Sequence, residues 1–516
     1  MNPPAPQSST SAPTAARRSG WRNALLLTGP SVAYLALRFL LSPIQIRVLT
    51  SLLDKADYGI ISLIAATVTV IAILASFGHF EFMIRRLPGQ PDDLQYATLR
   101  RMSRFFLPLI LLVAVLTAVF LGQMPGFEEH GGGLSPPQRL LTAAALGLLA
   151  FLLQRIFFLV SRAEWIKVRT LQLLQSDTWF LPFLLAYALG ARGLSAALWV
   201  WVGWLFCTNV LAFSWTRGTQ TASPLPAELG IKAALLFGMP LLPWLVGELL
   251  LRLGDRYVLL AYRGPEIVAN YTLCANIGIL IYTVAAIGMD PFIPELSRTC
   301  NRAAPATDGA AAASTLFSTM LRLALSISLA GCMFMLVGNR ALLDLLGGTR
   351  FLDAAGLLWW FAPVPILSVL WACGSRLLLL KNRCIWMGVL TLSACALNVG
   401  ANLLVVPRFG EQGAAAVYLT TLAALGGATA VTAKAWRYIH PTTLQPLHLA
   451  AWTLVCACIL GALRWLWPHA PALPWLLTAA VLCTPFAFLI GVIRASDFSF
   501  AERTSPAVRP VLPAEP

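Results

Sequence analysis

The sequence has 516 residues, of which 58% are hydrophobic and 11% are charged, and its formal net charge is +15. Soluble globular proteins carry roughly 25% charged residues, so this composition excludes a water-soluble protein. The apolar residues come in blocks of about 20, the length that crosses a bilayer as a helix. The basic residues recur in short bursts between these blocks rather than in one patch, which argues against nucleic-acid binding. We therefore predict an all-α polytopic membrane protein.

Fourteen apolar segments are predicted to span the membrane. They follow residues 1–22, a stretch rich in Pro, Ser and Ala that is predicted to be a disordered tail. The predicted spans are 24–46, 60–83, 105–121, 140–160, 170–189, 194–214, 231–251, 268–290, 316–337, 355–375, 384–406, 412–433, 446–466 and 472–493.

The distribution of basic residues predicts the direction of these spans. With both termini in the cytoplasm, cytoplasmic loops hold roughly twice as many Lys and Arg residues as the outer loops, as cytoplasmic loops of membrane proteins do. The predicted protein therefore crosses the membrane many times, with both termini in the cytoplasm.

The second half of the sequence repeats parts of the first. Gly29 and Arg47 match Gly238 and Arg256 at a separation of 209 residues, and segment 190–196 matches segment 410–416 at a separation of 220. Such repeats predict two parallel six-helix lobes plus two C-terminal helices, with a transport substrate bound between the lobes. The predicted parts are a cytoplasmic tail 1–22, an N-lobe 23–215 (spans 1–6), a cytoplasmic linker 216–229, a C-lobe 230–437 (spans 7–12), spans 13 and 14 in 438–494, and a cytoplasmic tail 495–516.

The motifs of soluble enzymes are missing from the sequence. None of the five Lys residues follows a Gly, so a phosphate-binding P-loop cannot occur. The cysteines never form a CxxC pair, which argues against a zinc site. We therefore expect a transporter without ATPase activity, not an enzyme, with no cofactor and with H⁺ or Na⁺ as the candidate coupling ion.

Four segments carry a resemblance to a known family. They are the loop 52–63 before span 2, Gly238-Met239-Pro240 with Asp255-Arg256 in span 7, the segment 294–298, and the segment 402–416 between spans 11 and 12. Together they resemble bacterial polysaccharide flippases of the multidrug/oligosaccharidyl-lipid/polysaccharide exporter superfamily, over about residues 20–435.

The resemblance implies a flippase that moves a polyprenyl-diphosphate-linked oligosaccharide from the cytoplasmic to the periplasmic leaflet. The moved glycan would serve synthesis of a surface polysaccharide, such as lipopolysaccharide O-antigen, capsule or exopolysaccharide. Membrane lipid, a polysaccharide polymerase and chain-length machinery are the implied partners.

Several arginines lie inside predicted spans, where a charge is costly and is a candidate for function. Arg38, Arg155 and Arg322 lie within spans 1, 4 and 9, and the repeat-matched Arg47 and Arg256 lie at the outer ends of spans 1 and 7. Arg side chains grip phosphate oxygens in a bidentate manner, so these residues predict a cationic cavity for a lipid diphosphate. The alternative is that each one reaches an interface or pairs with a local carboxylate.

Span 7 carries four ionisable residues on one helix face: Glu248, Arg252, Asp255 and Arg256. They form either a self-neutralised ladder or a site in which Arg252 and Arg256 face substrate and an acid couples transport to an ion. The candidate coupling acids are Glu248, Asp255, Asp177 and Asp290.

Three other functions remain open. A drug or organic-cation antiporter of the same superfamily would need acids rather than arginines in its N-lobe. A lipid II flippase also fits 14 spans and an arginine-lined cavity. A membrane glycan polymerase or ligase would need a large outer loop, and the outer loops of this sequence are short.

Overall fold

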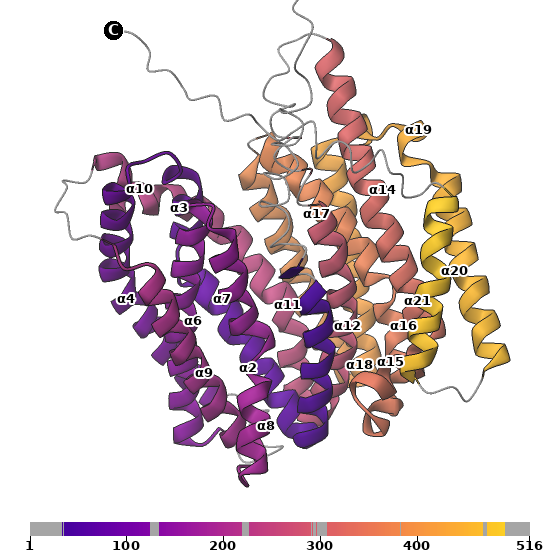
Figure 1. Cartoon of the computed structure of the whole chain (residues 1–516), viewed down its shortest axis with the longest axis horizontal. Helices are drawn as coiled ribbons and strands as arrows, with labels where there is room; N and C mark the ends of the chain where they lie inside the picture. Colours follow the sequence, from indigo (N-terminus) through magenta and orange to yellow (C-terminus); the bar gives the residue numbers. More distant parts are fainter. Residues whose placement is uncertain are drawn as a thin grey trace, which may run out of the picture.

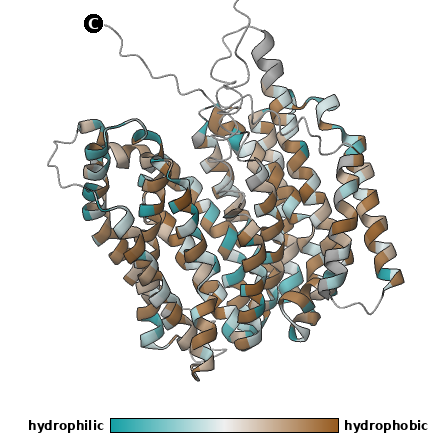
Figure 2. Ribbon diagram, viewed as in Figure 1, coloured by the Kyte–Doolittle hydropathy of each residue, from teal (hydrophilic) through white to brown (hydrophobic). Residues whose placement is uncertain are grey.

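The computed structural model describes residues 33–34, 36–123, 134–218, 226–289, 292, 296, 307–381, 383–467 and 472–490, which form helices and no strands. Within these residues, nine helices are long and apolar enough to cross a membrane, and a bent pair over Thr349–Phe361 and Val364–Leu380 would make ten. Figure 2 shows hydrophobic residues, in brown, along helices of both halves of the molecule. The predicted all-α polytopic fold is confirmed.

One group of helices stands at the left of Figure 1, and we call it the N-terminal bundle. It consists of α2 (Lys55–Leu74), α3 (His79–Arg86), α4 (Asp92–Gly122), α6 (Pro136–Ser161), α7 (Trp165–Asp177), α8 (Phe180–Ala188), α9 (Gly193–Trp215), η1 (Ala227–Leu229) and α10 (Ile231–Gly238). Helix α6 lies at its centre, since it packs against α2, α3, α4, α7 and α9.

The remaining helices form the C-terminal bundle at the right of Figure 1. It consists of η2 (Met239–Leu241), α11 (Leu242–Arg263), α12 (Pro265–Met289), α14 (Thr307–Val337), α15 (Asn339–Leu346), η3 (Thr349–Gly356), α16 (Leu357–Phe361), α17 (Val364–Leu380), α18 (Cys384–Ala433), η4 (Ala435–Tyr438), α19 (Pro441–Leu444), α20 (Pro446–Leu466) and α21 (Ala472–Leu489). Helices α20 and α21 pack on its outer side, α20 against α14 and α21 against α15.

The two bundles touch along α2, which packs against both α11 and α12. A further helix over residues 36–52 contacts both bundles. Its Arg38 pairs with Asp177 of α7, and its Arg47 donates a hydrogen bond to the carbonyl oxygen of Asp344 in α15. The predicted lobe boundaries and the internal repeat stay predictions, because they describe an ancestry and a symmetry that these contacts do not test.

Each predicted span overlaps a described helix, but several spans are broken. Span 2 divides into α2 and α3 where Phe77 and Gly78 have φ of 48° and 75°, left-handed values that end a helix. Span 5 divides into α7 and α8, and span 10 into η3, α16 and α17. Hydropathy did not reveal these breaks, because a bend changes the direction of the chain and not its composition.

Span 7 is divided between the two bundles. Its first part, α10, packs against α3 and α4, whereas its second part, α11, packs against α12 and α18. The break between them lies against the break in span 2: a Cβ added to Gly238 would stand 1.8 Å from the carbonyl oxygen of Phe77, and one added to Gly78 would stand 2.5 Å from the Cα of Gly238. Only glycine fits at this crossing.

Spans 11 and 12 are joined without a loop in α18. A straight helix of 50 residues would be about 75 Å long, but Gly410 has φ 58° and ψ −138° and separates two helices. The chain reverses direction at Gly410. This follows from a contact between the two ends of α18: Lys381, just before its start, donates a hydrogen bond to the carbonyl oxygen of Ala433 at its last residue. With this reversal, α18 packs against both α11 and α17.

Candidate substrate cavity

A cavity of about 720 Å³ lies between the two bundles. Its walls are the helix over residues 36–52, α2, α6, α7 and α9 on one side, and α11, α12, α16, α17 and α18 on the other. Clefts of this size between helices are typical ligand sites. The chemistry of the cavity therefore depends on which face of each helix is turned inward.

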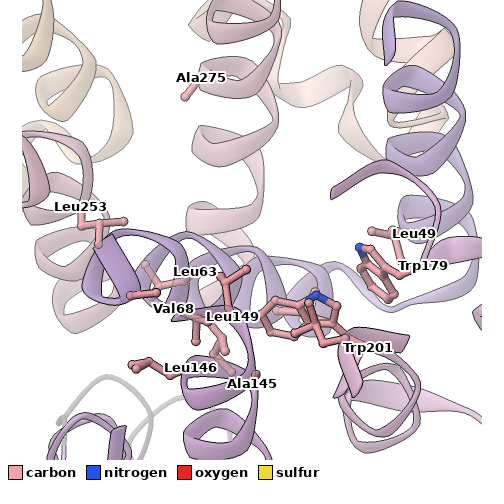
Figure 3. Packing of buried hydrophobic residues seen from close by; sticks show 14 of the residues in the cluster. Leu49, Leu63, Val68, Ala145, Leu146, Leu149, Trp179, Trp201, Leu253 and Ala275 are labelled. Carbon is pink, nitrogen blue, oxygen red and sulfur yellow. The ribbon is translucent and has the colours of Figure 1, made fainter. Parts of the chain in front are cut away.

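The wall formed by α2 and α6 is apolar. Helix α6 presents Leu149, Leu153, Ile156, Phe157 and Val160 to the cavity, a spacing that keeps side chains on one helix face. Behind this wall the core is closely packed by residues such as Leu63, Val68 and Leu146, which are fully buried (Figure 3). This part of the cavity can accept apolar ligand surface but offers it no charge.

The wall formed by α11 carries three charged residues, Arg252, Asp255 and Arg256. Arg252 Nη2 lies 2.6 Å from Glu248 Oε1, one turn earlier. Asp255 does not continue this ladder. It accepts hydrogen bonds from the Tyr271 hydroxyl and from the backbone N–H of Arg256, the latter at 2.7 Å. The predicted ladder is thus present only at its first step.

Arg256 is the exception among these charges. Its side chain is buried, with the residue 6% exposed, and its Nε has no hydrogen-bond partner among the described residues. The neighbouring Asp255 interacts with it electrostatically, but no ion pair or hydrogen bond joins the two side chains. A buried cation without a hydrogen-bonded acceptor is unfavourable, and a guanidinium presents its donors in a fork that matches phosphate or carboxylate oxygens. Arg256 is therefore the residue of this wall that is best arranged to bind an anion.

The opposite wall carries one charged lining residue, Arg38. Its Nε lies 3.7 Å from Asp177 Oδ2, and its Nη1 donates to the Tyr34 hydroxyl at 3.0 Å. Asp177 also accepts a hydrogen bond of 2.6 Å from the Ser42 hydroxyl. The structure thus brings together Arg38 and Asp177, two residues predicted separately, as an ion pair that tethers the helix over residues 36–52 to α7.

Arg155 lies outside the cavity, contrary to the prediction. Its Nη1 donates to Thr216 Oγ1 at 2.8 Å, and its guanidinium lies over the rings of Phe151 and Phe213, at 4.6 and 5.3 Å from their centroids. The cause is the phase of α6: residues 153, 156 and 157 face the cavity, so position 155 points to the other side.

Arg322 and Arg47 also lie away from the cavity lining. Arg322 is 1% exposed, and its Nη1 donates to the carbonyl oxygen of Thr443 at 2.8 Å, which fixes the segment before α20. Arg47 bonds the end of α15, as described above. The predicted cavity role is not supported for either. Asp290 lies outside the described residues, as does the segment 294–298 except Leu296.

One end of the cavity is closed by polar contacts between helix 36–52, the start of α2 and the α15–η3 region. Lys55 Nζ lies 2.8 Å from Asp353 Oδ2, and Thr50 Oγ1 donates to the carbonyl oxygen of Leu346 at 2.8 Å. Arg350 donates to the carbonyl oxygen of Thr50. These contacts join two segments about 300 residues apart in the chain, just beyond the lining residues Leu49 and Tyr58.

Uncharged lining residues were missed by the sequence analysis. They are Tyr34, Gln45, Gln172, Gln175, Trp179, Trp201 and Asn276. One signal was available: Gln172, Gln175, Ser176 and Asp177 form a polar run inside predicted span 5, which is unusual for a lipid-facing segment.

Comparisons with known proteins identify a family for this chain and proteins that share its fold. Residues 22–300 match the family model described as polysaccharide biosynthesis protein. No curated protein is significantly similar in sequence to this chain.

Solved structures of transporters share the fold. The lipid II flippase MurJ in an inward closed conformation is similar over 90% of this chain and 98% of its own, with a TM-score of 0.64 at 12% identity. An inward-facing multidrug resistance MATE family transporter of the MOP superfamily is similar over 77% and 94%, with a TM-score of 0.59 at 15% identity. A MOP superfamily transporter from Pyrococcus furiosus, described as having a binding pocket of reverse polarity, gives 0.53 at 16% identity over 83% and 96%. At such identities the likeness shows a common fold.

Proposed function

The chain belongs to the polysaccharide biosynthesis protein family, and from that premise we propose that it is a flippase for a polyprenyl-diphosphate-linked oligosaccharide. The headgroup enters the cavity between the bundles while the polyprenyl tail stays in lipid. No bond is made or broken, so the protein acts as a transporter and not as an enzyme.

The observation that carries this proposal is the buried Arg256 on the cavity wall, whose Nε has no hydrogen-bond partner among the described residues. A lipid diphosphate brings at least two negative charges and several acceptor oxygens, which satisfy the donors of a buried arginine. Arg252, already paired with Glu248, adds a second cation one turn away. Arg38 supplies a third across the cavity, neutralised in part by Asp177.

The cycle is alternating access between the two bundles. In the described conformation the contacts around Lys55 and Asp353 join the bundles at one end of the cavity. Release on that side requires these contacts to break, and the cavity then opens where it is now closed.

The driving ion in this proposal is H⁺ or Na⁺, because the sequence has no P-loop. Asp255 is the first candidate for coupling, since it lies on the cavity wall beside Arg256. Asp177 and Glu248, each paired with an arginine, come second. Transport driven in vesicles by a pH gradient alone or by a Na⁺ gradient alone would identify the ion.

We place the protein in the bacterial inner membrane, as its resemblance to bacterial polysaccharide flippases implies, and both termini in the cytoplasm, on the distribution of Lys and Arg between loops. Transport then runs from the cytoplasmic to the periplasmic leaflet. The product would be used for lipopolysaccharide, capsule or exopolysaccharide by a polymerase and its chain-length partners.

A leaflet-resolved assay in proteoliposomes tests the proposal. Fluorescent polyprenyl-diphosphate oligosaccharide is placed in both leaflets, and an impermeant quencher reports the fraction that changes leaflet. The wild type should exchange the lipid faster than protein-free vesicles and faster than the Arg256→Ala variant.

Absence of exchange by the wild type would overturn the proposal. Exchange of lipid II alone, or uptake of organic cations in the same vesicles, would favour the two related transport functions. Growth of the glycan chain would favour a polymerase.

A further inference from the structure

The two walls of the cavity differ in chemistry. Among the described lining residues the cations are Arg38, Arg252 and Arg256, and two of the three lie on α11. The wall formed by helix 36–52, α7 and α9 instead presents primary amides and two indole rings. A single ligand in this cavity would therefore meet charge on one side and neutral polar groups on the other.

The amides on this wall are available to a ligand. Gln45 and Gln175 line the cavity, and the structure gives neither side chain a hydrogen-bond partner among the described residues. Gln172 accepts a hydrogen bond of 2.9 Å from Arg169 Nη1, which leaves its NH₂ group free to donate. A primary amide both donates and accepts, as a sugar hydroxyl does, so each amide can satisfy a hydroxyl in both roles.

Two tryptophans stand next to these amides. Trp179 follows α7 and Trp201 belongs to α9, and their ring centroids are 6.3 Å apart. Both line the cavity and are at most 6% exposed, so each offers a ligand only a small part of its indole; Figure 3 shows both rings. A flat apolar ring with a polar N–H edge suits a ligand that has an apolar face and a polar rim, which describes a sugar ring.

Charge on this wall is neutralised. Its one lining cation, Arg38, is ion-paired with Asp177, and that carboxylate accepts a further hydrogen bond from Ser42. An acidic sugar placed here would find only Arg38, whose charge Asp177 already neutralises in part. A neutral sugar meets no such penalty, because its hydroxyls need only the amides.

We propose that the wall of Gln45, Gln175, Trp179 and Trp201 is a subsite for the uncharged sugar units next to the diphosphate, while Arg256 holds the diphosphate itself. This inference rests on the proposed flippase function and adds the substrate class to it. The protein then selects neutral over acidic headgroups by the composition of one wall.

Equilibrium binding to the purified full-length protein tests the subsite with three radiolabelled probes. The probes are polyprenyl diphosphate without sugar, the same lipid with a neutral disaccharide, and the same lipid with a uronic-acid-containing disaccharide. The wild type should bind the neutral form about tenfold more tightly than the uronic form.

The Gln45→Leu/Gln175→Leu variant should lose about tenfold in affinity for the neutral form, since each lost hydrogen bond weakens binding several-fold. Its affinity for the sugar-free lipid should stay within about twofold. Gln123→Leu, at an exposed amide beyond α4, is the matched control and should change neither. The two single variants serve if the double variant does not fold.

Equal loss for the sugar-free and neutral forms, no loss for either, or a wild-type preference for the uronic form would each overturn the subsite. In each of these cases the wild type still binds a polyprenyl diphosphate lipid, so the proposed function stands. Failure of the wild type to bind any of the three lipids would instead overturn the proposed function, so the two failures are distinguishable.

Discussion

Arg155 and Arg256 are both buried arginines inside predicted spans, yet the regions around them differ. Arg155, between α6 and α9, is enclosed by Phe151 and Phe213 and donates to Thr216. Arg256, on the cavity face of α11, has no acceptor for its guanidinium among the described residues. In the first region two aromatic rings and one hydroxyl contact the guanidinium, although its Nε has no hydrogen-bond partner. In the second region the guanidinium makes no hydrogen bond to a described residue, and a ligand can supply the acceptors.

This difference separates two reasons for a charge within the membrane. At both positions, placing a charged arginine inside a membrane span costs free energy. Location within a span therefore does not by itself indicate function. The informative property is whether the fold satisfies the group. Four substitutions test this distinction, beginning with the one expected to have the largest effect.

Arg256→Ala should reduce flipping by about 100-fold or more, because it removes two charge-assisted hydrogen bonds of roughly 1.5–3 kcal/mol each. Leaflet exchange in proteoliposomes measures the loss. Arg256→Lys should recover only part of the rate, since an ammonium cannot bind two oxygens in a fixed fork. Wild-type transport by the alanine variant would remove Arg256 from the substrate site.

Arg252→Gln should reduce flipping by about tenfold, an intermediate effect, because Glu248 already neutralises much of this charge. The Glu248→Gln/Arg252→Gln double variant should transport better than Arg252→Gln alone, since it does not leave the Glu248 carboxylate without its partner. The same leaflet-exchange assay applies. A loss as severe as that of Arg256→Ala would show that partnering does not distinguish the two arginines.

Arg322→Met should lower stability and spare transport. The change leaves the Thr443 carbonyl without the donor that fixes the segment before α20, at a cost of about 1–3 kcal/mol. Thermal unfolding in detergent should shift downward, whereas flipping per folded molecule should be unchanged. Arg340→Met, at an exposed position of α15, is the control. An unshifted midpoint with lost transport would contradict this structural role.

Arg155→Met should have the smallest effect, within about twofold in transport. Methionine fills the space between the two phenylalanine rings and carries no charge to desolvate. Thr216 Oγ1 keeps its hydrogen bond of 2.8 Å to the carbonyl oxygen of Ala212. If this variant folds normally but no longer flips lipid, Arg155 belongs to the transport path.

Much of the fold could be predicted because membrane helices must be long, apolar and internally hydrogen-bonded. Each predicted span overlaps a helix for this reason. The breaks at Gly78 and Gly410 could not be predicted, since glycine is common in membrane spans and its left-handed backbone leaves no mark in hydropathy.

The site was predictable only in part. Arg252, Asp255 and Arg256 fall close together on one helix, so finding one on the cavity wall brings the others near it. Arg155 was misplaced because α6 is apolar on all sides, and its sequence does not show which face turns inward. Gln45 and Gln175 were not predicted as site residues. An amide carries no charge, so placing it inside a membrane span costs less free energy than placing a charged group there.

The reversal at Gly410 has a consequence for how the protein can be probed from outside its bilayer. Proteases and many antibodies need several residues of extended, accessible chain, but only Gly410 departs from helical geometry within the 50 residues of α18. This tip should therefore resist proteolytic nicking that ordinary interhelical loops do not. An epitope or cleavage sequence inserted there would have to form the entire loop between the two helices. Insertions of increasing length at this position would therefore measure how long a loop the two joined spans tolerate.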